Sequence, residues 1–133
     1  MSLHIAYDYQ CPVCGVNFIP YKEGGMVCPQ CGAKTDEYFN FIDRAIASIK
    51  YHLEYYGKIH PGAWLVSSFA DAILEDIFEI LEIFKASPNI TDFNSFAKTV
   101  LEQRIPEHEK YLRQHIFDMT VIIKGKLEKE GLY

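Results

Sequence analysis

The chain of 133 residues is 49 % hydrophobic and 14 % aromatic, a composition that supports a packed core and excludes an intrinsically disordered protein. Its formal net charge is −5 and it has no basic block: residues 1–36 carry two lysines against three acids, and residues 37–133 carry eleven basic residues against fifteen acids. A nucleic acid is therefore not favoured as a partner. There is no signal-peptide pattern and no apolar run of about 18 residues, so we expect neither secretion nor a membrane span.

The four cysteines lie in two motifs of the same form, Cys11-Pro12-Val13-Cys14-Gly15 and Cys28-Pro29-Gln30-Cys31-Gly32. In each motif the proline fixes φ where the turn begins, and the glycine allows a left-handed backbone after the second cysteine. Four thiolates can enclose one Zn²⁺ tetrahedrally, and paired C-x-x-C motifs are a strong indication of such a site. We therefore predict that Cys11, Cys14, Cys28 and Cys31 bind Zn²⁺, with iron as the alternative metal. Two disulfides, or free thiols, are the alternatives to a metal.

A metal site of four thiolates has consequences for location and chemistry. Thiols that stay reduced indicate a reducing compartment, so we expect the protein in the cytoplasm. A closed shell of four sulfurs leaves no position for a substrate water, so the site is expected to be structural rather than catalytic.

Residues 7–34 resemble a zinc ribbon, in which two cysteine turns sit on a small β-hairpin, and we assign residues 1–34 to this module. Short strands are expected at Tyr7–Gln10, Val16–Ile19 and Met26–Val27, with a turn at Lys22–Gly25. The segment is also similar to short rubredoxin-like modules, which share the C-P-x-C-G motif and can hold iron. The resemblance implies a metal site but no particular activity, because such modules occur in many unrelated proteins.

The aromatic residues of this module exceed what so small a unit can bury alone. They are Tyr7, Tyr9, Phe18 and Tyr21. We expect them to dock the ribbon on the helical part of the chain; a surface for a partner or ligand is the alternative.

Residues 35–133 are predicted to form four amphipathic helices. The first runs from an N-cap at Asp36 to Tyr56 and is ended by Gly57; the second runs from Pro61 to Ala86. The third is capped by Thr91 and ends near Ile105, and the last starts at Pro106, unless both are one helix kinked at that proline. Short connections predict a mostly antiparallel, up-down four-helix bundle. Broad apolar faces at Leu74, Phe78, Phe117 and Val121 suggest a homodimer.

A helical bundle beside a cysteine module also resembles the rubrerythrins, whose bundle holds two irons on glutamates and Glu-x-x-His pairs. The sequence contains no Glu-x-x-His, so the resemblance does not extend to the di-iron site.

Three other groups of residues are candidate sites, each with a structural alternative. His108, Tyr111, His115 and Asp118 share one face of the last helix and could bind a second metal or carry acid–base chemistry, or simply form a solvated or interfacial face. Asp71, Glu75, Glu79 and Glu82 form an acidic stripe that could meet a basic partner or a cation, or be the wet side of a helix. Tyr51, His52, Tyr55, Tyr56 and Trp64 gather rings at one end of the bundle, for recognition or for packing.

No phosphate-binding loop, dinucleotide-binding turn or nucleophile elbow is present. We therefore predict a zinc-binding protein that acts through protein–protein interaction, as a regulator or adaptor rather than an enzyme. The alternatives are a rubrerythrin-like iron redox protein and a nucleic-acid-binding regulator that uses the ribbon.

Overall fold

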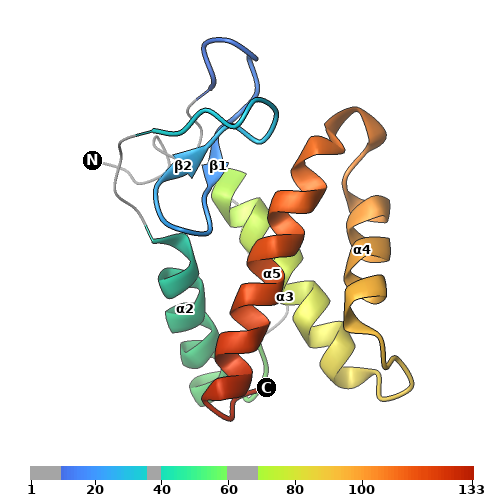
Figure 1. Ribbon diagram of the computed structural model, residues 1–133. Coiled ribbons are helices and arrows are strands. Elements are labelled where there is room, and N and C mark those ends of the chain that lie inside the picture. Colours follow the sequence, from blue (N-terminus) through green and yellow to red (C-terminus); the bar gives the residue numbers. More distant parts are fainter. Residues whose placement is uncertain (1–9, 36–39, 60–68) are drawn as a thin grey trace.

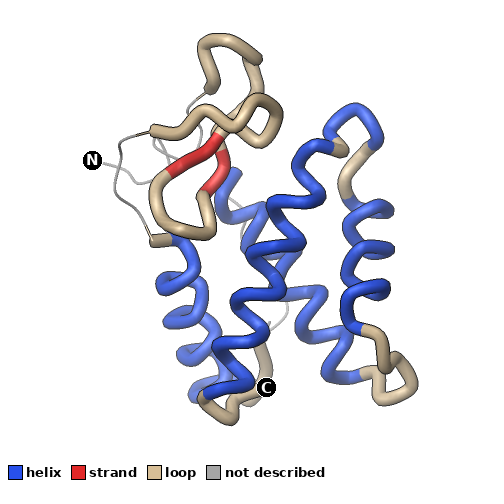
Figure 2. Tube along the Cα trace, in the orientation of Figure 1, coloured by secondary structure: helices blue, strands red, loops and turns tan. Residues whose placement is uncertain are grey.

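Four helices and a small sheet make up the computed structural model, which describes residues 10–35, 40–59 and 69–133. The helices are α2 (Phe41–Tyr56), α3 (Phe69–Ala86), α4 (Phe93–Arg104) and α5 (Tyr111–Lys129), with a 3₁₀ turn, η1 (Glu107–Glu109), before α5. Helix α5 contacts each of the other three helices and is the centre of the bundle (Figure 1). The sheet consists of β1 (Ile19–Pro20) and β2 (Met26–Val27) and lies at one end of the helices (Figure 2).

The directions of the helices differ from the predicted up-down order. Helices α3 and α4, and likewise α4 and α5, run antiparallel, but α2, α3 and α5 all run away from the sheet (Figure 1). The expectation assumed a short connection between the first two helices. Twelve residues separate Tyr56 from Phe69, and at roughly 3.3 Å per residue they can reach back along α2. The predicted first part of the second helix, residues 61–68, lies outside the described residues.

The ends of the helices are set by local capping bonds. Helix α2 begins after Asn40, whose side chain accepts from the amide of Asp43 at 3.1 Å; the N-cap predicted at Asp36 lies outside the described residues. Gly57 ends α2 in the left-handed region at φ 73°, as predicted. Helix α4 is capped by Asp92 rather than Thr91, because the Asp92 carboxylate accepts from the amide of Ser95 at 3.2 Å.

Pro106 separates α4 from α5 more completely than predicted. It has an extended backbone at ψ 159°, and η1 follows it, so the last helix begins at Tyr111 and not at Pro106. The freed carbonyl of Ile105 accepts a hydrogen bond of 2.7 Å from the Arg113 guanidinium. The two helices are therefore distinct elements and not one kinked helix.

The sheet is antiparallel, with Ile19 opposite Val27 and Pro20 opposite Met26. The turn predicted at Lys22–Gly25 joins the strands, and it is closed by a 2.9 Å bond from the amide of Tyr21 to the carbonyl of Gly25. The strand expected at Val16–Ile19 is shifted: β1 starts only at Ile19, and Gln10 and Asn17 form an isolated bridge. Residues 7–9 of the first expected strand lie outside the described residues.

The ribbon segment and the helices share one hydrophobic core. Phe18, Ile19, Met26 and Val27 are buried in the same cluster as the inner faces of all four helices, and β1 contacts α3. Tyr21 is half-buried against this cluster, with the Lys34 ammonium 4.5 Å from the centre of its ring. The docking predicted for Phe18 and Tyr21 is thus confirmed, whereas Tyr7 and Tyr9 lie outside the described residues.

The apolar faces that suggested a homodimer are used largely within the chain. Phe78 is fully buried, Leu74 and Phe117 are half-buried against the core, and Val121 is 37 % exposed. Phe78 therefore offers no surface to a second copy. Among the described residues, no helix combines the length and apolarity needed to cross a membrane.

Candidate metal centre

The two cysteine motifs fold into matching turns. In each turn the glycine amide donates to the carbonyl of the first cysteine, and the amide of that cysteine donates to the carbonyl five residues later. The bonds are Gly15 N to Cys11 O at 2.8 Å and Cys11 N to Val16 O at 2.8 Å, then, seventeen residues on, Gly32 N to Cys28 O at 2.9 Å and Cys28 N to Ala33 O at 2.7 Å. Bridges at the same spacing, Gln10–Asn17 and Val27–Lys34, flank the turns. Both glycines are left-handed, at φ 73° and 82°, where a Cβ would be strained.

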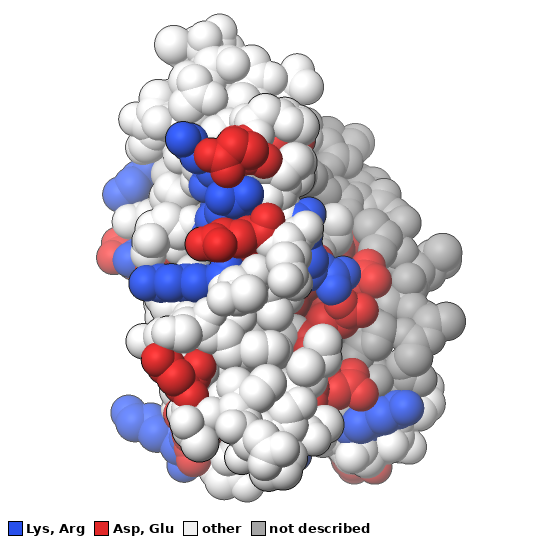
Figure 3. Space-filling view, turned by 90° about the vertical axis from the view of Figure 1, so that its right-hand side faces the viewer, with Lys and Arg blue, Asp and Glu red and all other residues white. Residues whose placement is uncertain are grey.

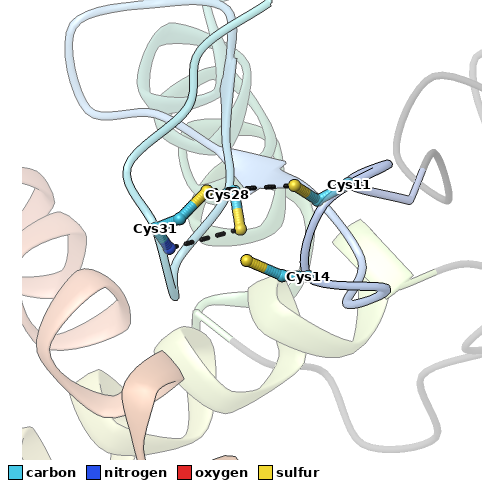
Figure 4. A group of neighbouring side chains, drawn as sticks. All are labelled: Cys11, Cys14, Cys28 and Cys31. Carbon is cyan, nitrogen blue, oxygen red and sulfur yellow. Dashed lines mark hydrogen bonds between the residues drawn. The ribbon is translucent and has the colours of Figure 1, made fainter.

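These matching turns bring the four sulfurs to one point. All four Sγ atoms lie within 4.8 Å of one another, and they converge on a common space (Figure 4). The Sγ atoms of Cys11 and Cys31, from opposite turns, are 3.8 Å apart. A regular tetrahedron of sulfurs about 2.3 Å from a central Zn²⁺ has edges of about 3.8 Å. The group therefore has the size needed to hold a metal ion.

None of the four sulfurs is bonded to another, so the disulfide alternative does not describe this structure. The amide of Cys31 points at the Cys28 sulfur, 3.5 Å away, and such N–H groups favour a thiolate. This arrangement is suited to sulfur anions that bind a cation.

The thiols perturb one another because they are so close. The pKa of Cys14 is raised to about 12, first by its hydrogen bond with Cys31 and then by burial and the remaining cysteines. The pKa of Cys11 is lowered to about 7, chiefly by a backbone hydrogen bond from Cys14. Four neighbouring thiolates cannot all form at neutral pH on their own, whereas a divalent cation among them would supply the charge that holds all four deprotonated.

The face of α5 that carries His115 and Asp118 is one of the contacts between the ribbon and the bundle, beside that of β1 with α3. The Lys22 ammonium lies 3.6 Å from the Asp118 carboxylate. The half-buried His115 ring lies near the backbone of Pro29, in the second cysteine turn. Burial is the main reason why the pKa of His115 is lowered; nearby Asp118 opposes the shift and Lys22 adds to it. Sequence reasoning missed Lys22 and Pro29 as the partners of this face.

A second metal site does not form on this face. The His108 side chain is 78 % exposed and lies beside Glu109, at 3.5 Å. Within the described ranges, the four cysteines are the group of ligand side chains close enough to hold a metal. Tyr111 lies near the centre, because it lines one cavity together with Gly15 of the first cysteine turn. Its pKa is raised, first by burial and then by Glu109 and the cysteines.

In the two remaining candidate groups, the acidic stripe and the rings at the end of α2, some residues make contacts that stabilise the fold. In the acidic stripe, Glu79 pairs with Arg104 of α4, and Arg104 also contacts Asp76 at 2.7 Å. At the end of α2, His52 is buried, and its Nδ1 lies 2.8 Å from the carbonyl oxygen of Ile59. Its neighbours Tyr51, Tyr55 and Tyr56 are 52 %, 65 % and 56 % exposed, and Trp64 lies outside the described residues.

The face shown in Figure 3 carries charges of both signs. On the face turned toward the viewer in Figure 3, lysines and arginines adjoin aspartates and glutamates, with no block of one sign. This face therefore gives no extended track for a phosphate backbone.

No known family model, curated protein or solved structure matches this chain. The chemistry of the four sulfurs and their surroundings therefore carries the functional argument.

Proposed function

We propose that Cys11, Cys14, Cys28 and Cys31 ligate one Zn²⁺ in a structural zinc ribbon, and that the protein acts in the cytoplasm as a regulatory or adaptor protein that binds another protein. The observation that carries the metal part is the convergence of four unbonded sulfurs within 4.8 Å. Four sulfur donors fill a tetrahedral shell, so the ion would hold the fold together and leave no position for a substrate.

The ribbon needs such an ion because its described part, residues 10–35, has little regular structure of its own. Its two strands are two residues long each, and its two turns are closed by a few backbone bonds. We propose residues 1–34 as the metal-folded unit and residues 35–133 as the helical unit on which it docks.

Metal analysis of the purified chain tests this proposal and separates it from the iron alternative. We expect a colourless protein with one zinc per chain, and no bound metal in a variant with all four cysteines replaced by serine. A red protein with one iron per chain would favour the rubredoxin-like alternative. A wild-type chain that takes up neither metal would overturn the proposal.

The adaptor role is supported by the exposed tyrosines at the end of α2. Tyr51, Tyr55 and Tyr56 are each more than half exposed and contact one another, with 4.6 Å between the ring centres of Tyr51 and Tyr55. Exposed rings with polar tips are enriched at protein interfaces.

A comparison of native pull-downs tests the adaptor role. We expect one partner to be retained by the wild-type chain and lost from the triple variant Tyr51→Ser, Tyr55→Ser, Tyr56→Ser. Val13→Ser is the matched control, since Val13 is 85 % exposed at the first cysteine turn. Equal capture by all three chains would remove this role for the tyrosines.

A further inference from the structure

The four cysteine residues differ in their exposure to solvent. Cys28 and Cys11 are 0 % and 2 % exposed, and Cys14 is half-buried, but Cys31 belongs to the exposed residues. A small oxidant arriving from solvent would therefore meet Cys31 first, since exposure and thiolate character control cysteine oxidation.

The sulfur of Cys31, the most exposed of the four residues, has a partner across the site. The Sγ of Cys31 is 3.8 Å from that of Cys11, which comes from the other turn (Figure 4). A disulfide needs the two sulfurs at about 2.05 Å, so the pair must close by about 1.8 Å. A bond between them would take two of the four ligands out of the shell and leave too few sulfurs to hold the ion.

Loss of the ion would also affect the helices, because they share one core with the ribbon. Phe18, Ile19, Met26 and Val27 lie in the same buried cluster as the helices, and β1 contacts α3. A ribbon that loses its metal would release these side chains and uncover the apolar surface of α3 beneath them.

We propose that the ribbon is a redox-sensitive switch, in which hydrogen peroxide oxidises Cys31, Cys11 resolves the product as a Cys11–Cys31 disulfide, and Zn²⁺ leaves. This inference rests on the proposed zinc site. The Cys31 thiolate attacks one peroxide oxygen, the O–O bond breaks, and the leaving hydroxide takes a proton to become water. The Cys11 thiolate then attacks the sulfenic sulfur of Cys31, the S–O bond breaks, and a second hydroxide leaves as water. The two sulfurs give up two electrons, peroxide accepts them, and zinc remains Zn²⁺.

The test uses the zinc-loaded full chain and hydrogen peroxide, with zinc release followed by a colorimetric chelator and disulfides mapped by peptide mass spectrometry. We expect up to one zinc released per chain, a Cys11–Cys31 disulfide as the main product, and increased binding of an apolar dye. Zinc that stays bound, or disulfides mainly within each turn (Cys11–Cys14 and Cys28–Cys31), would overturn the inference.

Two matched variants locate the reactive sulfur. Cys31→His and Cys28→His each replace one thiolate by another zinc ligand, and both are first checked for bound zinc. We expect peroxide to release zinc from Cys31→His at least ten times more slowly than from Cys28→His, and equal rates would count against Cys31. Where either variant fails to fold, the disulfide map of the wild-type chain decides. A wild-type chain that never binds zinc refutes the proposed function, whereas a zinc-loaded chain that resists peroxide refutes only the switch.

Discussion

At the scale of single residues, His115 shows how one side chain joins the metal module to the bundle. Its ring is half-buried between α5 and the second cysteine turn, where it lies near the backbone of Pro29 and near Asp118 and Lys22. Burial lowers its pKa below the ordinary value, so the folded protein favours the neutral ring.

The lowered pKa of His115 predicts a pH dependence of stability. Because the folded pKa lies below the unfolded value, this contribution is fully present above pH about 6.5 and is lost as the pH falls through the folded pKa. Between pH 7.5 and 5.5, we expect the wild-type chain to lose more unfolding free energy in urea titrations than His115→Asn. The exposed His108 supplies the control: His108→Asn should lose as much unfolding free energy between these pH values as the wild type. If His115→Asn also loses as much as the wild type, His115 does not cause the pH dependence.

Two glycines provide a second comparison at this scale. Gly15 lies at φ 73° with no neighbour within 4 Å of an added Cβ, so the cost of Gly15→Ala is backbone strain, about 1–2 kcal/mol. Gly125, in the exposed part of α5, also has open space, and Gly125→Ala should stabilise the protein by about 1 kcal/mol. Urea unfolding of both variants checks this prediction. A Gly15→Ala chain as stable as the wild type would contradict the role of the left-handed turn.

At the scale of the elements, the contact between α3 and α4 depends on one arginine. Arg104 at the end of α4 bridges Asp76 and Glu79, which lie one turn apart on α3. The pKa of Asp76 is raised, mainly by its burial, although Arg104 works in the opposite direction. The carboxylate is thus held charged in a partly desolvated position by its partner.

Replacing Arg104 should destabilise the protein, because the partly buried Asp76 carboxylate would lose its cationic partner. We expect Arg104→Ala to lower the unfolding free energy by about 1–3 kcal/mol at pH 7, because Asp76 is left charged without its partner. The loss should shrink in acid, where Asp76 takes up a proton. Lys50→Ala breaks the exposed pair with Glu130 and serves as the control, with an expected loss below about 1 kcal/mol. Equal losses from the two variants would show that burial of Asp76 has no effect.

Element boundaries show how far local sequence signals reach. Gly57 was predictable as the end of α2 because only the residue itself and its neighbours decide a left-handed cap. The sequence could not predict that Asp92 rather than Thr91 caps α4, since both side chains can cap a helix and the two residues are adjacent. Pro106 correctly indicated a break, but the η1 turn after it depends on Arg113, which binds the Ile105 carbonyl from the following helix.

At the scale of the whole molecule, the shared core couples the proposed metal site to the bundle. Cys11 and Cys28 are themselves part of the buried cluster that includes residues of α3 and α5. The metal would therefore stabilise the ribbon directly and the ends of the helices indirectly.

Removing the metal should unfold the ribbon unit while the helical unit stays folded. Structural zinc sites in comparable peptides contribute roughly 10–16 kcal/mol, far more than two short strands can replace. We expect Cys28→Ser, or prolonged chelation, to abolish amide protection in residues 10–35 while α4 and α5 keep theirs, as measured by hydrogen exchange. Helical circular dichroism should fall only slightly. Complete loss of the helical signal would show that residues 35–133 do not fold without the metal module.

The sequence by itself determined the cysteine turns and the helical nature of the rest. Ligand spacing, prolines and left-handed glycines act over five residues, and apolar periodicity acts over single helices, so both can be recognised along the chain. Only the tertiary structure decided that α2, α3 and α5 run in the same direction, and that His115 and Asp118 face the ribbon while His108 faces solvent. Those outcomes depend on which amphipathic faces pack together, and residues far apart in the sequence, such as Lys22 and Asp118, meet only after that packing is complete.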